Sequence, residues 1–178
     1  MQAFELGILN WIQIHCRCAA LDVLMPAVSL ICNHAEVWIV LAVILLLNKK
    51  TRRPGTVLAV ALLLDYFVCN MTLKPLIGRI RPCDVNQAVR LLIHRPGDYS
   101  FPSGHSASSF AAVGALKASG SRLWVPALVL GLLICFSRLY LYVHWPSDVL
   151  GGIALGMALG YLARYLVQRS EHPPVERE

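Results

Sequence analysis

The chain alternates between long apolar blocks and short polar connections. A helix needs about 20 apolar residues to cross the hydrocarbon core of a bilayer, which is about 30 Å thick. Four blocks have roughly this length, and Pro, Gly or a cluster of charges separates each from the next. The pattern predicts membrane-spanning helices at residues 53–76, 103–117, 123–140 and 146–167.

The N-terminal third has shorter apolar blocks. Residues 1–16 are amphipathic and carry Trp11, which predicts a helix that lies in the membrane interface. Residues 19–33, interrupted by Pro26, and residues 34–47 predict two further spans, the first short or tilted. The expected fold class is all-α: a polytopic membrane helix bundle with about six transmembrane helices and an N-terminal interfacial helix. Five full spans with two interfacial helices is an alternative.

The composition supports a membrane protein. Of the 178 residues, 57% are hydrophobic and 15% are charged, and the mean hydropathy is +0.59. Soluble domains carry about 45–50% apolar and about 25% charged residues, so disordered, collagen-like and coiled-coil classes are excluded and a soluble fold is disfavoured. The six cysteines are expected to be free, because the chain is neither small nor rich in loops. Residues 1–15 show no pattern of a cleavable signal peptide.

The net charge of +6 follows the predicted topology. Cations gather in connections that alternating spans place on one side, at residues 49–53, 117–122 and 164–169. By the positive-inside rule this side is cytoplasmic, so the basic balance does not indicate a nucleic-acid partner. The connection 79–101 then faces outward, although it also carries Arg79, Arg81, Arg90 and Arg95. Because these cations break the rule, we expect them to have a specific role.

We expect one membrane-embedded domain over residues 1–169, followed by a disordered polar tail over 170–178. Gly152, Gly156 and Gly160 recur at a spacing of four, which favours close packing of the last span against another helix of the same fold. Aromatic residues near the span ends are expected to anchor at the membrane interface, namely Trp124, Tyr140, Tyr142 and Trp145. The sequence leaves the oligomeric state open.

Three polar clusters lie at span ends that alternation brings to the same membrane face. The clusters are Lys74, Arg81 and Pro82; Pro102, Ser103, Gly104 and His105; and Ser137, Arg138, His144 and Asp148. Nothing in the composition requires this convergence, so we expect one functional site at that face.

The first part of the chemistry is anion binding. Lys74, Arg81 and Arg138 have no matching carboxylate beside them in the sequence, and unpaired cations near lipid are costly unless they bind an anion. Ser103 and Gly104 stand where a helix begins, and the free N–H groups of a helix N-terminus bind phosphate well. Glycine also lets an oxygen approach the backbone closely, since it has no Cβ.

The second part of the chemistry is nucleophilic. His144 precedes Pro146, and Asp148 follows four residues after His144. A carboxylate bonded to one ring nitrogen fixes the tautomer and leaves the other nitrogen free to attack. His105 supplies a second imidazole, which suits protonation of a leaving oxygen near neutral pH. No cluster of acids or histidines has the spacing of metal ligands, so neither a metal nor a cofactor is expected.

These clusters resemble the three signature motifs of the type 2 phosphatidic acid phosphatase superfamily, with no departure at a signature position over residues 74–148. The resemblance implies a six-helix membrane core and a metal-independent phosphatase that works through a phosphohistidine. It implies that His144 is the nucleophile, Asp148 its partner and His105 the general acid. The residues that it implies for phosphate binding are Lys74, Arg81, Ser103, Gly104 and Arg138.

The sequence therefore predicts an integral membrane lipid phosphatase, whose partners are a lipid phosphate substrate and the bilayer. We expect it in the inner (plasma) membrane with the site facing the periplasm or exterior, a location that favours undecaprenyl pyrophosphate as the substrate. Phosphatidic acid, phosphatidylglycerophosphate and lipid A phosphates stay open, as does transfer of the phosphoryl group to another lipid. The superfamily's soluble vanadium haloperoxidases are disfavoured by the composition. A non-enzymatic transporter or scaffold would not need the nucleophile pair.

Overall fold

A computed structural model describes residues 2–171 of the chain, and every regular element within this range is a helix. The N-terminal elements are α1 (Gln2–His15), α2 (Ala19–Leu30) and α3 (Glu36–Leu47). They are followed by α4 (Arg52–Asp65), the π-helix η1 (Tyr66–Leu73), α5 (Lys74–Ile77) and α6 (Pro82–Val85). The C-terminal elements are α7 (Gly104–Ala118), α8 (Trp124–Tyr140) and α9 (Pro146–Glu171). The all-helical prediction is confirmed over this range.

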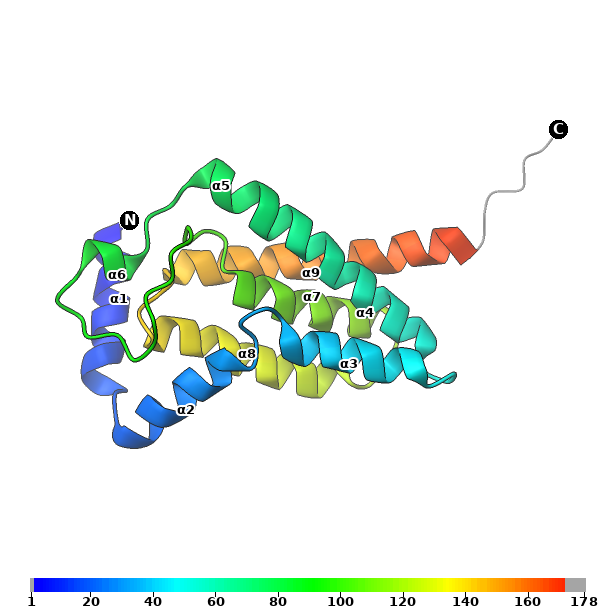
Figure 1. The fold of residues 1–178 in the computed structure, drawn as a ribbon, viewed down its shortest axis with the longest axis horizontal. Helices are drawn as coiled ribbons and strands as arrows, with labels where there is room; N and C mark the ends of the chain where they lie inside the picture. Colours follow the sequence, from blue (N-terminus) through cyan, green and yellow to red (C-terminus); the bar gives the residue numbers. More distant parts are fainter. Residues whose placement is uncertain (1, 172–178) are drawn as a thin grey trace.

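The helices α3, α4, α7, α8 and α9 form an elongated bundle, and the long connection from α5 to α7 runs over one of its ends (Figure 1). At this end α1 and α6 lie across the bundle, while α2 runs obliquely toward it (Figure 1). The segment α4–η1–α5 is one nearly continuous helix, interrupted by a π-helical stretch that the sequence pattern did not predict.

Proline and serine mark several of the helix starts. Pro146 is the first residue of α9, and Pro126 lies in the first turn of α8. The missing N–H of proline costs nothing at these positions, because the first N–H groups of a helix have no partner within it. Ser103 caps α7, with its hydroxyl oxygen 3.4 Å from the N–H of Ser106.

The helix pair α7 and α9 forms the centre of the bundle. A Cβ added at Gly160 would lie 2.6 Å from the backbone N of Ala115, and one added at Gly152 would lie 2.6 Å from the carbonyl oxygen of Ser103. Only glycine permits this approach, since any side chain would collide with backbone of the partner helix. The prediction that the glycine stripe packs inside the fold is confirmed.

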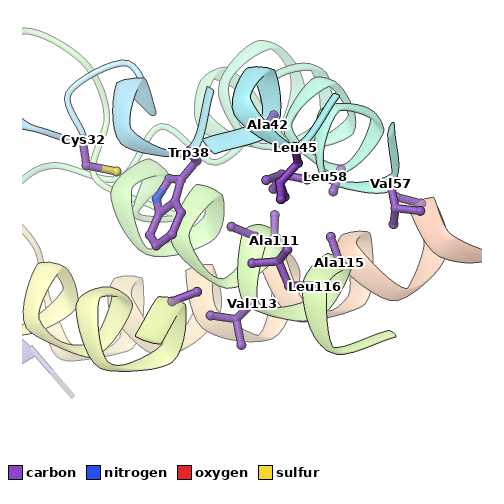
Figure 2. Packing of buried hydrophobic residues seen from close by; sticks show 14 of the residues in the cluster. Cys32, Trp38, Ala42, Leu45, Val57, Leu58, Ala111, Val113, Ala115 and Leu116 are labelled. Atoms are coloured by element: carbon purple, nitrogen blue, oxygen red, sulfur yellow. The ribbon is translucent and has the colours of Figure 1, made fainter. Parts of the chain in front are cut away.

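A second layer packs on this pair. Trp38 and Leu45 of α3 and Leu58 of α4 are buried against α7, together with Ala111 and Leu116 (Figure 2). The indole N–H of Trp38 donates to the hydroxyl of Ser109 at 3.1 Å, which satisfies a polar group that is buried in this layer. This core holds α3, α4, α7 and α9 in fixed positions behind the polar end of the bundle.

Helix lengths give partial support to the predicted spans. Two helical stretches, Arg52–Val85 and Pro146–Glu171, are long and apolar enough to cross a membrane. The helices α2 and α3 have 12 residues each, so each is about 18 Å long, well short of a bilayer core of about 30 Å. The structure therefore establishes an all-helical bundle, and the count of six spans stays a prediction.

The ends of the chain and the aromatic residues differ in detail from the sequence analysis. The helix α9 continues to Glu171, two residues into the segment 170–178 that was predicted as a polar tail, and residues 172–178 lie outside the described range. Tyr140, Tyr142 and Trp145 are buried in the protein, so the prediction that they anchor at the membrane interface is wrong.

Candidate active site

The three polar clusters meet at one end of the bundle. Lys74 begins α5, Gly104 begins α7, Arg138 lies in the last turn of α8, and Asp148 lies in the first turn of α9. These helix ends lie on the same side in Figure 1, which is also the side of the connection that leads from α5 to α7. The convergence that span alternation predicted is therefore present in the fold.

One cavity of about 1180 Å³ joins most of the predicted site residues. The residues of the predicted site that line it are Lys74, Arg81, Gly104, His105, Arg138 and His144. The same cavity continues between α2, α3 and α4, where apolar side chains such as Leu30, Val43 and Leu62 line it. The polar site thus opens directly into an apolar groove within the helix bundle.

Arg81 lies at the centre of the polar part. It is only 2% exposed, and its Nη1 donates to the carbonyl of Val143 at 2.7 Å and lies 3.1 Å from Nε2 of His144. Its Nε donates to the carbonyl of Asp98 at 2.8 Å. These bonds hold the guanidinium directly beside Nε2 of His144, the predicted nucleophile.

A carboxylate lies between two of the predicted phosphate-binding cations. Asp98 accepts a hydrogen bond from Nη2 of Arg81 at 2.7 Å, and its other oxygen accepts one from Nζ of Lys74. The expectation that these cations have no matching carboxylate is therefore wrong. Sequence distance hid the pairing, because Asp98 stands 24 residues after Lys74 in the connection that folds back over the site.

The charges of this cluster also act on Asp98. Burial by itself would raise the pKa of its carboxyl, but the hydrogen bond from Lys74 and the charges of Lys74 and Arg81 lower the pKa overall. Asp98 is thus ionised at neutral pH and occupies two of the donors that are predicted to bind phosphate.

Arg138 lies deeper than the other cations. It is 3% exposed, its Nη1 donates to the hydroxyl of Ser29, and no carboxylate within residues 2–171 pairs with it. Its Nε has no hydrogen-bond partner in the same range, and neither does Nε2 of His105. Two buried polar atoms that border the cavity thus have unused hydrogen-bonding capacity, which is what a site for an oxyanion requires.

His144 and Asp148 lie side by side beneath the cavity. Nδ1 of His144 is 3.5 Å from Oδ2 of Asp148, a long contact that keeps the carboxylate beside the ring without a strong hydrogen bond. Burial lowers the pKa of His144 and the charge of Arg81 lowers it further, so the ring is neutral and Nε2 keeps its lone pair. A neutral imidazole with one nitrogen facing an anion site is suited to nucleophilic attack.

Two predicted residues do not line the cavity. Asp148 does not border the cavity and lies beside His144, the residue that it is predicted to support. Ser103 is fully buried, and its hydroxyl accepts from Ser106 instead of facing the cavity. Its observed role is to begin α7, so that Gly104 presents backbone to the site beside Asn70 and Lys74.

Several residues around the site belong to none of the three sequence clusters. Asp98, Asn70 and Ser29 line the cavity, and no sequence spacing singled them out. Arg79 belongs to the outward cations that break the charge rule, and it contacts Asp148 at 2.6 Å. The break in the positive-inside rule was therefore the sequence feature that pointed to a role for Arg79. No sequence feature pointed to its partner Glu5.

The described part of the chain holds no group of three or more His, Cys, Asp or Glu side chains arranged as metal ligands. The groups that border the cavity are cations, imidazoles and helix N-terminal backbone. Together they can hold a phosphoryl group and attack it, which defines a phosphoryl-transfer site inside a membrane helix bundle.

Comparison with known proteins identifies the family. The sequence model of the PAP2 superfamily matches residues 54–172. An undecaprenyl-diphosphatase of Sulfolobus acidocaldarius is 32% identical over 142 residues, which cover 79% of this chain and 67% of that protein. The putative undecaprenyl-diphosphatase YbjG of Escherichia coli is 37% identical over 141 residues, covering 77% of this chain and 70% of that protein.

Solved structures agree with this assignment. The transmembrane PAP2-type phosphatidylglycerolphosphate phosphatase from Bacillus subtilis superposes with a TM-score of 0.73 at 25% identity, covering 99% of this chain and 89% of that one. Aquifex aeolicus LpxE gives a TM-score of 0.75 at 26% identity, covering 89% and 93% of the two chains. The chain belongs to the PAP2 superfamily of membrane lipid phosphatases, and the resemblance seen in the three motifs is confirmed.

Proposed function

We propose that this integral membrane enzyme removes the terminal phosphate of a polyprenyl pyrophosphate, with undecaprenyl pyrophosphate as the favoured substrate. The observation that carries the proposal is the cavity of about 1180 Å³, in which buried cations and two histidines open into an apolar groove. A water-soluble phosphate ester would not need that groove, whereas a lipid tail fits it. Relatives named as undecaprenyl-diphosphatases support this choice of substrate.

The reaction has two half-reactions in this proposal. Nε2 of His144 attacks the terminal phosphorus, and a P–N bond forms while the bond from that phosphorus to the bridging oxygen breaks, so that polyprenyl monophosphate leaves. His105 donates a proton to the leaving oxygen, then removes a proton from the water that hydrolyses the phosphohistidine. Arg81 and Arg138 stabilise the negative charge on the phosphoryl oxygens during both steps.

The remaining cradle comes from two other segments. Lys74 adds a third cation, and Gly104 exposes the N-terminal backbone of α7 to the phosphate. Ser103 contributes by capping that helix. Asp148 stabilises the positive charge on the His144 ring when the phosphohistidine forms.

Other lipid phosphates remain alternative substrates. Proteins named as lipid A 4'-phosphatase and phosphatidylglycerophosphatase B are also similar to this chain. A phosphotransferase would differ only in the group that attacks the phosphohistidine. Phosphate release from a panel of purified lipids, containing undecaprenyl pyrophosphate, phosphatidylglycerophosphate and phosphatidic acid, distinguishes these activities.

The decisive variant is His144→Ala. We expect it to abolish both covalent labelling of the protein by the ³²P-labelled lipid and release of phosphate. Lys50→Ala, at the opposite end of the bundle, is the matched control and keeps both. Covalent labelling that survives in His144→Ala would refute the role of this histidine.

Metal independence is a separate test of the mechanism. The cations and helix N-terminal amides already neutralise a phosphate, so activity should survive an excess of EDTA. Loss of activity on chelation, with recovery after magnesium is added, would contradict a mechanism that relies on the protein's own charges.

The topology that we propose is a single membrane-embedded domain of about six spans over residues 1–169, in the inner membrane, with α1 in the interface and the site facing outward. A cysteine at Arg95 in a variant without native cysteines should react in intact cells with a membrane-impermeant thiol reagent. A cysteine at Thr51 should not. The reverse pattern would move the site to the cytoplasmic face.

A further inference from the structure

The carboxylate of Asp148 is shared between His144 and a second group. Its Oδ1 accepts a hydrogen bond from Nη1 of Arg79 at 2.6 Å. Its Oδ2 accepts one from the backbone N–H of Trp145 at 2.9 Å and faces His144. Because Asp148 is fully buried, these contacts determine how the carboxylate is oriented and how much of its charge His144 experiences.

Arg79 is itself held by an acid from the other end of the sequence. Its Nη2 donates to Oε2 of Glu5 at 2.7 Å, and its Nη1 also donates to the hydroxyl of Ser147 at 2.6 Å. The guanidinium lies over the ring of Trp145, 5.2 Å from its centroid. Oε1 of Glu5 accepts the backbone N–H of Ser147 at 2.9 Å. Helix α1 therefore joins the catalytic pair through a continuous chain of polar contacts.

The charges along this chain explain why an acid in α1 matters. Glu5 is 4% exposed, and although burial would raise the pKa of its carboxyl, the hydrogen bonds from Ser147 and Arg79 lower the pKa overall. Arg79 alone would neutralise Asp148. With Glu5 ionised, the group of three carries a net charge of one negative unit.

We propose that Arg79 and Glu5 are positioning residues for catalysis: Arg79 orients the Asp148 carboxylate toward His144, and Glu5 restores the negative charge that Arg79 would otherwise cancel. The inference rests on the proposed function, in which His144 becomes a phosphohistidine. When Nε2 bonds to phosphorus, the proton on Nδ1 stays in place and the ring becomes positive. A net negative group on the Asp148 side stabilises that positive ring.

A purely structural role makes different predictions. If Glu5 and Arg79 only held α1 on the bundle, their loss would lower the amount of folded protein and the unfolding temperature. It would leave kcat per folded molecule and the shape of the pH profile unchanged.

The first experiment uses Glu5→Gln in the purified full chain, with the lipid of the panel that the wild type hydrolyses. We expect kcat to fall about 10-fold, the lower end of the loss seen when a residue that orients a metal-binding histidine is removed, with KM within about 2-fold. The acidic limb of the kcat profile should move to lower pH, because removing a negative charge makes His144 harder to protonate. Glu5→Asp keeps the charge and should keep the limb in place.

The second experiment is a double-mutant cycle. Arg79→Gln should lower kcat by about 100-fold, and Arg79→Lys should lose less, because lysine keeps the charge but not the paired donors. Adding Glu5→Gln to Arg79→Gln should cause little further loss, since Glu5 acts through Arg79. If the loss of kcat in the double variant equals the product of the two single losses, the proposal is overturned.

The control is Asp84→Asn, which breaks the 3.0 Å ion pair with Arg95 on the surface of the same connection and should leave kcat and the pH limb unchanged. Unfolding temperatures of all variants show whether each is folded. A wild type that forms no phosphohistidine and releases no phosphate from the panel refutes the proposed function and this inference with it. An active wild type with an unchanged Glu5→Gln profile refutes this inference alone.

Discussion

Both ends of the bundle carry cations, but their surroundings differ. At the end formed by the α3–α4 connection and the end of α9, Arg53 is 49% exposed and pairs with Glu171 at 2.6 Å. At the other end Arg81 and Arg138 are 2% and 3% exposed. A charge that stays in water costs little, whereas a buried charge needs partners or a ligand.

The difference separates two uses of positive charge. The exposed cations fit the sidedness rule for membrane insertion, which depends on their number and place along the chain. Arg81 belongs to the connection whose cations break that rule, and it is buried and held by specific bonds, such as that to the carbonyl of Val143. Burial therefore separates the cations that we propose bind phosphate, such as Arg81, from exposed cations that the sidedness rule counts, such as Arg53.

The largest expected effect tests this difference directly. Arg81→Ala should lower kcat/KM by about 10²–10³-fold, the loss observed when one stabilising donor of an oxyanion is removed. Arg53→Ala, at the exposed end, should change kcat/KM less than 2-fold, because exposed ion pairs contribute little energy. Activity of both variants on the same lipid is the measurement, with Arg81→Lys included to retain the charge. Similar losses in Arg81→Ala and Arg53→Ala would remove the distinction.

The next effect distinguishes the two histidines of the buried end. A lipid alkoxide leaves only with a proton, whereas a substituted phenolate needs little help. We expect His105→Ala to lose about 10²–10⁴-fold on a lipid monophosphate and clearly less on p-nitrophenyl phosphate. His144→Ala should abolish turnover of both. Equal losses of His105→Ala on both substrates would refute its role as the general acid.

The sequence predicted this end of the molecule well where the signal is local. Helix starts at Pro146 and Ser103 and the glycine stripe of α9 follow from short-range rules, so the helix starts and the close packing of α9 inside the fold were predicted. Alternation of spans then placed the motif residues at one end. Six of the eight predicted site residues line one cavity for this reason.

The missing parts depend on contacts that no spacing encodes. The connection after α5 folds back and brings Asp98 between Lys74 and Arg81, and α1 brings Glu5 to Arg79 across 74 residues of sequence. The aromatic residue Trp145 is a related case. Its place near a helix end predicted that it lies at the membrane interface. Its indole N–H instead donates to the carbonyl of Ile80 inside the protein. These residues are positioned by contacts between segments far apart in the sequence, which the pattern of apolar helices does not predict.

A smaller effect concerns Asp98, which pairs with the buried cations although its side chain is 52% exposed. Because its carboxylate uses donors of Lys74 and Arg81 that we propose bind phosphate, we expect it to compete with an anion in the site. Asp98→Asn should therefore tighten inhibition by orthovanadate about 2- to 5-fold, the range of a half-exposed ion pair. Asp84→Asn is the control. Weaker inhibition in Asp98→Asn would instead mean that the carboxylate organises the cations for the anion.

The smallest effect belongs to the exposed end. The pair of Arg53 with Glu171 joins the start of α4 to the end of α9, but both side chains are more than a third exposed. Water screens such a pair, so Glu171→Gln should lower the free energy of unfolding by at most about 1 kcal/mol, and the effect should shrink as salt is added. Unfolding in detergent at low and high salt measures it, with kcat expected to stay unchanged. A salt-independent loss well above that size, or a fall in kcat, would show that this end also holds its charges in a structured site, and the contrast between the two ends would fail.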